Sequence, residues 1–206
     1  MRKSLLFVWA CMGLVCLMSA CKTSVKSKEW KLVWVEDFDQ KNSFDESVWT
    51  KIPRGTSDWN NYMSYYDSCY AMQDGNLILR GIANHTQKND TAPYLTGGVY
   101  TKGKKLFTGG RVEVCARLQA AKGAWPAIWM LPEKAEWPKG GEIDIMERLN
   151  HDRIAYQTTH SYYTHILGIK DNPPHGGINK INPEEYNIYS VDIYPDSLVF
   201  AVNHRH

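Results

Sequence analysis

Gly140-Gly-Glu-Ile-Asp-Ile-Met-Glu147 is the most informative stretch of this 206-residue chain. Side chains alternate between the two faces of a β-strand, so we expect Glu142 and Asp144 on one face and the isoleucines on the other. Strict alternation would place Glu147 beside the isoleucines, where a lone carboxylate is costly. One extra residue, a β-bulge near Ile145-Met146, would return it to the side of the other two acids. The stretch therefore predicts a bulged strand with three carboxylates on one face.

Three acids on one face of a strand favour a catalytic role over a structural one, because like charges repel and raise each other's pKa. Retaining glycoside hydrolysis needs two carboxyl groups about 5–5.5 Å apart, one ionised as nucleophile and one protonated as acid. With the bulge, Glu142 and Glu147 are about 13 Å apart at the backbone, and leaning side chains could close most of that gap. Asp144 between them can hold Glu142 in place. The alternative is a solvated polar face, although such a face usually mixes acids with Lys, Thr or Ser.

From Trp30 onward the chain consists of short strand-like runs separated by turn residues, with almost no helical periodicity. Such a pattern indicates an all-β sandwich or barrel. Long polar connections are expected at the surface, and they cover residues 52–64, 84–96 and 168–187. The expected strands include Lys31–Glu36, Asn76–Arg80, Arg111–Leu118, Ser190–Tyr194 and Asp196–Asn203.

The acidic strand Glu142–Glu147 resembles the active-site strand of glycoside hydrolase family 16 in its bulged, laminarinase-like form. The runs Leu32–Phe38, Gly110–Leu118 and Gly123–Pro132 are similar to the same family in order and spacing. The resemblance covers roughly residues 30–203. It implies a β-jelly-roll sandwich of two curved antiparallel sheets, with a concave glycan-binding cleft.

The same resemblance implies an endo-acting hydrolase of β-glycans that retains anomeric configuration, with an oligo- or polysaccharide as its partner. Glu142 would be the nucleophile, Glu147 the acid/base and Asp144 their assistant. The family's substrates include β-glucans, agar- and carrageenan-type galactans and β-1,4-galactosidic bonds of host glycans. A non-catalytic carbohydrate-binding jelly roll is the alternative, but it predicts losses among the carboxylates, and all three are present.

Four further residues are candidate substrate ligands. Trp125 and Trp129 lie four apart, so both can face one side and offer indole planes to sugar rings, with core packing as the alternative. His160 lies on the next expected strand, where the family often has a histidine near the nucleophile; a buried, hydrogen-bonded histidine is the alternative. Asn61 lies in Asn60-Asn61-Tyr62, where the family often has Asn-Asn-Glu, and its amide could bind a sugar hydroxyl.

The N-terminus has the pattern of a bacterial lipoprotein signal. Arg2 and Lys3 precede an apolar run that ends in Leu17-Met-Ser-Ala-Cys21, which resembles a lipobox. We therefore expect a signal peptide over residues 1–20, a lipid on Cys21 and a tether over residues 21–29. The protein would then be anchored in the bacterial cell envelope, at the outer membrane or cell surface; a plain signal peptide or short membrane anchor is the alternative.

Composition excludes several partners. Without Arg2 and Lys3, the 24 basic and 22 acidic residues become 22 of each, so no basic field would hold nucleic acid.

We expect no cofactor and no metal, and a monomer. Of the cysteines outside the signal and lipid site, Cys69 and Cys115 both lie in strand-like runs, where buried thiols are the default and a disulfide is the alternative.

The expected catalytic domain covers residues 30–206. The family normally continues for several strands beyond the segment that matches Ser190–Val202. We therefore expect that about a quarter to a third of the domain is missing after His206, judged against usual domain sizes. An inactive, truncated hydrolase is the corresponding alternative.

Overall fold

The computed structural model of the protein describes residues 30–40, 43–119 and 121–206. The second of the chain's two units, Leu32–His206, is compact and carries all of the strands of the described residues. The expected signal peptide, the tether and Cys21 lie outside the described residues. Within those residues, no helix has both the length and the apolar character needed to cross a membrane.

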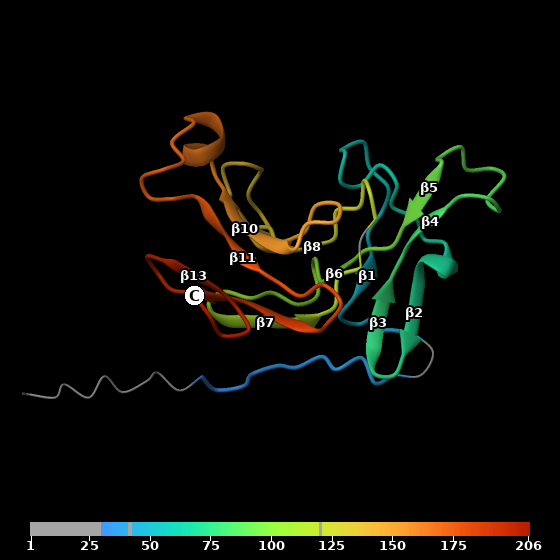
Figure 1. Cartoon of the computed structure of the whole chain (residues 1–206), viewed down its shortest axis with the longest axis horizontal. Coiled ribbons are helices and arrows are strands. Elements are labelled where there is room, and N and C mark those ends of the chain that lie inside the picture. Colours follow the sequence, from blue (N-terminus) through green and yellow to red (C-terminus); the bar gives the residue numbers. More distant parts are fainter. Residues whose placement is uncertain (1–29, 41–42, 120) are drawn as a thin grey trace, which may run out of the picture. The chain divides into compact units, whose positions relative to one another are not determined.

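Two antiparallel sheets form the body of the second unit (Figure 1). One is four-stranded, in the order β11-β10-β9-β8, and the other is three-stranded, in the order β13-β12-β7. The four-stranded sheet consists of β8 (Ala127–Met130), β9 (Glu142–Glu147), β10 (Ile154–His160) and β11 (Gly176–Lys180). The three-stranded sheet consists of β7 (Gly110–Ala116), β12 (Asn187–Ile193) and β13 (Leu198–Val202).

Three short antiparallel pairs and two short helices complete the described elements. Gly75 and the residue before it have positive φ angles of 69° and 52°, which suits the tight turn between β2 and β3. The pairs are β1 (Thr50–Lys51) with β6 (Val99–Tyr100), β2 (Tyr70–Gln73) with β3 (Asn76–Leu79), and β4 (Gly81–Ala83) with β5 (Tyr94–Thr96). The helices are the 3-10 helix η1 (Asp67–Cys69) and the π-helix η2 (Tyr162–Ile166).

The hydrophobic core lies between the two sheets, which form two layers in Figure 1. β12 contributes two fully buried residues, and the middle of β9 contributes two from the opposite sheet. Burial of these side chains is the main source of stability for a sandwich of this kind. The core cluster consists of Leu118, Ile145, Met146, Ala155, Ile181, Tyr189, Val191 and Val202.

Three of the expectations from sequence differ from the structure. Residues 31–36, expected as a strand, form none: Leu32 and Val33 are 75% and 87% exposed, whereas Trp34 packs against other aromatic rings. The polar connections 84–96 and 168–187, expected at the surface, contain β5 and β11. β11 is an edge strand with little burial, so its glycines and polar side chains give no alternating apolar pattern.

The cysteine expectations also need correction. Cys69 is buried but belongs to η1 rather than to a strand, and Cys115 lies on β7 as expected but is exposed. Both thiols are free, so the described residues contain no disulfide between them.

Val191→Ala tests the core assignment. Because Val191 is fully buried between the sheets, we expect a loss of about 2 kcal/mol in the free energy of unfolding, from lost burial and a residual cavity. Val33→Ala is the matched control at an exposed position and should change it by less than about 0.5 kcal/mol. Urea unfolding measures both, and equal losses would contradict the core described here.

Candidate active site

The site is built on a bulge in β9. On the β10 side, Glu147 pairs with Tyr156 and Asp144 pairs with Thr158, so two residues of β9 stand opposite Gln157 alone. On the β8 side the register also shifts, between Ile128 and Trp129. The extra residue predicted near Ile145-Met146 is therefore confirmed.

Because of the bulge, two neighbouring side chains of β9 point into the core, and its carboxylates point to the opposite face. Ile145 and Met146, 1% and 0% exposed, both pack in the core, which strict alternation would forbid for neighbours. Glu142, Asp144 and Glu147 are left on the other side, and we call this side of the four-stranded sheet the carboxylate face.

Each glutamate of the carboxylate face accepts a hydrogen bond from a tryptophan. Trp137 Nε1 donates to Glu142 Oε2 over 2.7 Å, and Trp125 Nε1 donates to Glu147 Oε1 over 2.8 Å. Both indoles are about half exposed, so their ring faces remain open to solvent beside the acids. An N–H donor to a carboxyl oxygen fixes the direction of the carboxyl group.

Asp144 has a different environment from the two glutamates. It is only 4% exposed, and its burial, followed by the charges of Glu147 and Glu142, raises its pKa to about 8. Its Oδ2 lies 3.3 Å from His160 Nε2 but without hydrogen-bond geometry. At neutral pH, Asp144 is therefore a neutral carboxylic acid between two glutamates.

The remaining expected site residues lie near the carboxylate face to different degrees. His160 pairs with Glu142 across the β9–β10 ladder and contacts Asp144. Trp129 pairs with Asp144 across the β8–β9 ladder, and its ring stands edge-on to Trp59 with 5.0 Å between centroids. Trp129 is thus on the carboxylate face and not in the core.

Asn61 lies in the turn region that follows Trp59, whose ring reaches Trp129. The Oδ1 atom of Asn61 is buried, and within the described residues it has no hydrogen-bond partner. The structure records no contact between Asn61 and the three carboxylates, so this residue is adjacent to the face only through the loop that carries it.

Sequence reasoning left two participants unassigned. Trp137 lies just before the acidic strand, where it could either flank a sugar subsite or cover the sheet; in the structure it donates to Glu142 and packs edge-on against His165 of η2, with 4.5 Å between ring centroids. Trp59 precedes the asparagine pair Asn60-Asn61 in the sequence. Its position before a polar loop gives no periodic signal, and only the folded loop brings it to Trp129.

The residues described here contain no group of three or more His, Cys, Asp or Glu side chains able to hold a metal ion.

Comparisons with known proteins identify the family of the chain. A family model described as "XgeA-like, catalytic GH16 domain" matches residues 68–176, more than half of the chain. The chain is 37% identical over 186 residues to a keratan-sulfate endo-1,4-beta-galactosidase of Sphingobacterium multivorum, covering 88% of this chain and 43% of that protein. It is 30% identical over 200 residues to a beta-glucanase of Rhodothermus marinus, covering 91% of this chain and 68% of that protein.

Among solved structures, the laminarinase catalytic domain of Thermotoga maritima superimposes with a TM-score of 0.73 at 28% identity, covering 86% of this chain and 76% of that one. The expected all-β jelly-roll class is therefore confirmed. The fold is the one found in the catalytic domains of the glycoside hydrolases that this chain resembles. The chain belongs to glycoside hydrolase family 16, and it spans less than half of the length of the galactosidase and about two thirds of the length of the glucanase.

The raised pKa of Asp144 predicts how stability depends on pH. Its pKa is about 8 in the folded protein and about 3.9 when unfolded, so between these values the folded state binds more protons. The free energy of unfolding should therefore fall as pH rises from about 4 to 8. Asp144→Asn, which keeps a neutral group of the same shape, should remove this decline and leave the variant about 1–3 kcal/mol more stable at pH 8.5.

Urea unfolding at pH 5 and pH 8.5 measures the difference. Asp196→Asn, the same exchange at an exposed turn, is the matched control and should follow the wild type at both pH values. An undiminished decline in Asp144→Asn would show that Asp144 is not the group that makes stability depend on pH in this range.

Proposed function

We propose that the protein is an endo-acting, retaining hydrolase of β-glycans, with Glu142 as nucleophile and Glu147 as acid/base. The observation that carries this proposal is the division of three acids on one face: two glutamates, each with its own indole donor, flank one buried, neutral aspartic acid. A retaining mechanism requires two carboxyl groups on the same side with different tasks.

The first step transfers the sugar to the enzyme. A carboxylate oxygen of Glu142 attacks the anomeric carbon while the glycosidic C–O bond breaks, and Glu147 gives its proton to the leaving oxygen. Trp137 holds Glu142 Oε2, which leaves Oε1 as the oxygen that we assign to the attack. Trp125 orients the carboxyl of Glu147 in the same way.

The second step releases the sugar. Glu147, now a carboxylate, takes a proton from water as the water attacks the anomeric carbon, and the ester bond to Glu142 breaks. Asp144 supports both steps as a neutral acid, because a third negative charge would oppose ionisation of its neighbours. His160 lies beside Asp144, with 3.3 Å between Nε2 and Oδ2.

The substrate that we favour contains β-1,4-galactosidic bonds, as in poly-N-acetyllactosamine chains. The 37% identity to a keratan-sulfate endo-1,4-beta-galactosidase exceeds the 30% identity to a beta-glucanase over similar lengths. The tyrosine of Asn60-Asn61-Tyr62, where the family often has glutamate, supports a substrate other than the usual glucans on that side. Trp125, Trp129 and Asn61 are the proposed sugar contacts, with His160 beside the nucleophile.

We further propose that the protein acts as a monomer, anchored by a lipid on Cys21 at the bacterial outer membrane or cell surface. The support is the sequence alone: Arg2 and Lys3, an apolar run too short to span a bilayer comfortably, and Leu17-Met-Ser-Ala-Cys21. Several acyl chains on one cysteine give durable anchoring, which suits an enzyme that degrades external polymers.

Reducing-end release tests the activity. The soluble form that begins after Cys21 should cleave keratan-type poly-N-acetyllactosamine in preference to laminarin, barley β-glucan, agarose and mucin O-glycans. Glu142→Gln should lower kcat/KM by about 1,000-fold or more while binding survives, because an amide cannot form the covalent intermediate. Glu113→Gln, the same exchange on β7 of the other sheet, should leave activity unchanged.

Retained hydrolysis in Glu142→Gln would overturn the assignment of the nucleophile. Binding to glycan without hydrolysis by the wild type would instead favour the carbohydrate-binding alternative, and preferential cleavage of laminarin would replace the galactosidic substrate with a glucan.

The lipid anchor is tested separately. In a bacterial host that acylates lipoproteins, the wild-type protein should incorporate labelled fatty acid and enter the detergent phase, whereas Cys21→Ser should do neither. Cys16→Ser, a matched exchange within the apolar run, should behave as the wild type. Acylation that persists in Cys21→Ser would exclude this cysteine as the lipid site.

A further inference from the structure

The bulge of β9 is contacted by one buried polar side chain that the catalytic steps do not use. Gln157 of β10 is 1% exposed and stands opposite Ile145 and Met146, where the register of the β9–β10 pair shifts. An uncompensated amide in an apolar core costs several kcal/mol, so a glutamine among Ile, Met and Val requires partners.

Gln157 has partners on three other strands. Its Nε2 donates to the carbonyl of Ile145 over 3.0 Å and, over 3.4 Å, to the carbonyl of Ala201 on β13 of the other sheet. Its Oε1 accepts from Asn179 Nδ2 of β11 over 2.8 Å. One side chain therefore joins the bulge to a neighbouring strand of its own sheet and to the facing sheet.

The bond to Ile145 is the one that concerns the site. Ile145 is the residue at which β9 leaves register with both neighbours, and the carboxylate face begins again two residues later at Glu147. A carbonyl at a bulge is less constrained by the regular ladder than other carbonyls of a strand. A buried donor at this carbonyl restricts the local φ and ψ angles and hence the direction of Glu147.

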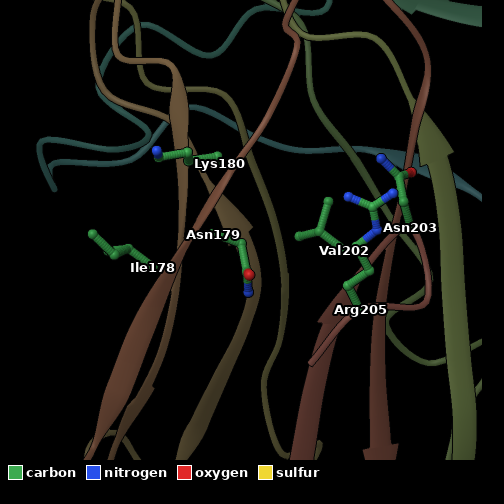
Figure 2. Close-up of a pocket in the computed structure, with 6 residues that line it drawn as sticks. All are labelled: Ile178, Asn179, Lys180, Val202, Asn203 and Arg205. Carbon is green, nitrogen blue, oxygen red and sulfur yellow. The ribbon is translucent and has the colours of Figure 1, made fainter.

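Asn179 donates to the oxygen of the Gln157 amide, and it lies on the edge strand β11, close to solvent. Together with Ile178 and Lys180 of β11, Val202 of β13 and two residues that follow this strand, it lines a cavity of about 360 Å³ (Figure 2). Asn179 is thus only partly buried and can be exchanged with less damage to the core than Gln157.

We infer that Gln157, oriented by Asn179, is a positioning residue that fixes the bulge of β9 and thereby aims Glu147 at the leaving oxygen. Gln157 acts through the backbone at Ile145 and does not touch the carboxylates. This inference rests on the proposed role of Glu147 as acid, and it adds residues on the core side of the sheet to the machinery of the site.

The test uses the fact that good leaving groups depart without protonation. A 2,4-dinitrophenyl glycoside needs little help from the acid, whereas the phenyl glycoside of the same oligosaccharide needs a proton on its oxygen. Gln157→Met, of similar volume without the amide, should lower kcat/KM about tenfold or more for the phenyl substrate and less than about threefold for the dinitrophenyl one. Asn179→Ala should change the ratio in the same direction by a smaller amount.

Val191→Ala is the matched control for lost stability. It removes a core contact of β12 and should lower the rates for both substrates equally, if at all. Amide hydrogen exchange gives a second measurement that does not depend on activity: the β9 amides near Met146 should exchange faster in Gln157→Met than in Val191→Ala at equal global stability.

A ratio of the two rates that stays at the wild-type value in both variants would overturn the inference, as would unchanged exchange of β9. If Gln157→Met does not fold, the ratio and exchange in Asn179→Ala decide. If the wild type cleaves neither glycoside but the exchange difference is seen, the proposed function has failed while the anchoring of the bulge stands.

Discussion

The spacing of Glu142 and Glu147 sets the constraint on which the rest of the site depends. They are five positions apart in the sequence, an odd number, so a regular strand would place them on opposite faces. The register shifts on both sides of β9 show that one inserted residue resolves this conflict. The insertion also allows Ile145 and Met146, adjacent in sequence, to enter the same core, so one local irregularity serves both sides of the sheet.

Collecting three carboxyl groups on one face has an electrostatic cost, and the structure distributes it unevenly. The two glutamates are less buried than the aspartate, and each has an indole donor. Asp144 is buried between them and keeps its proton at neutral pH, so the face carries at most two of the three possible charges. The asymmetry of environments, more than the number of acids, is what distinguishes this face from an ordinary polar surface.

Much of this could be predicted from sequence, because the relevant signals were local. The bulge followed from the parity of the acidic spacing, and β7, β12 and β13 followed from apolar alternation. Strand β11 was missed because Gly176–Lys180 has the composition of a loop, and residues 32–36 were wrongly expected as a strand because alternation does not report whether a partner strand exists. Cys115 was expected to be buried and is exposed.

The parts of the site that sequence could not give depend on contacts between distant segments. Trp59 contacts Trp129, which lies 70 positions later in the chain, and the local sequence around neither residue predicts this contact. Gln157 looked like an unremarkable polar residue within a strand, because its three partners come from β9, β11 and β13.

Tryptophan as the donor to both glutamates has a chemical consequence of its own. An indole N–H donates but never accepts, and it does not titrate in the physiological range. The donors to Glu142 and Glu147 therefore stay in place across the pH range in which a histidine would lose one of its protons.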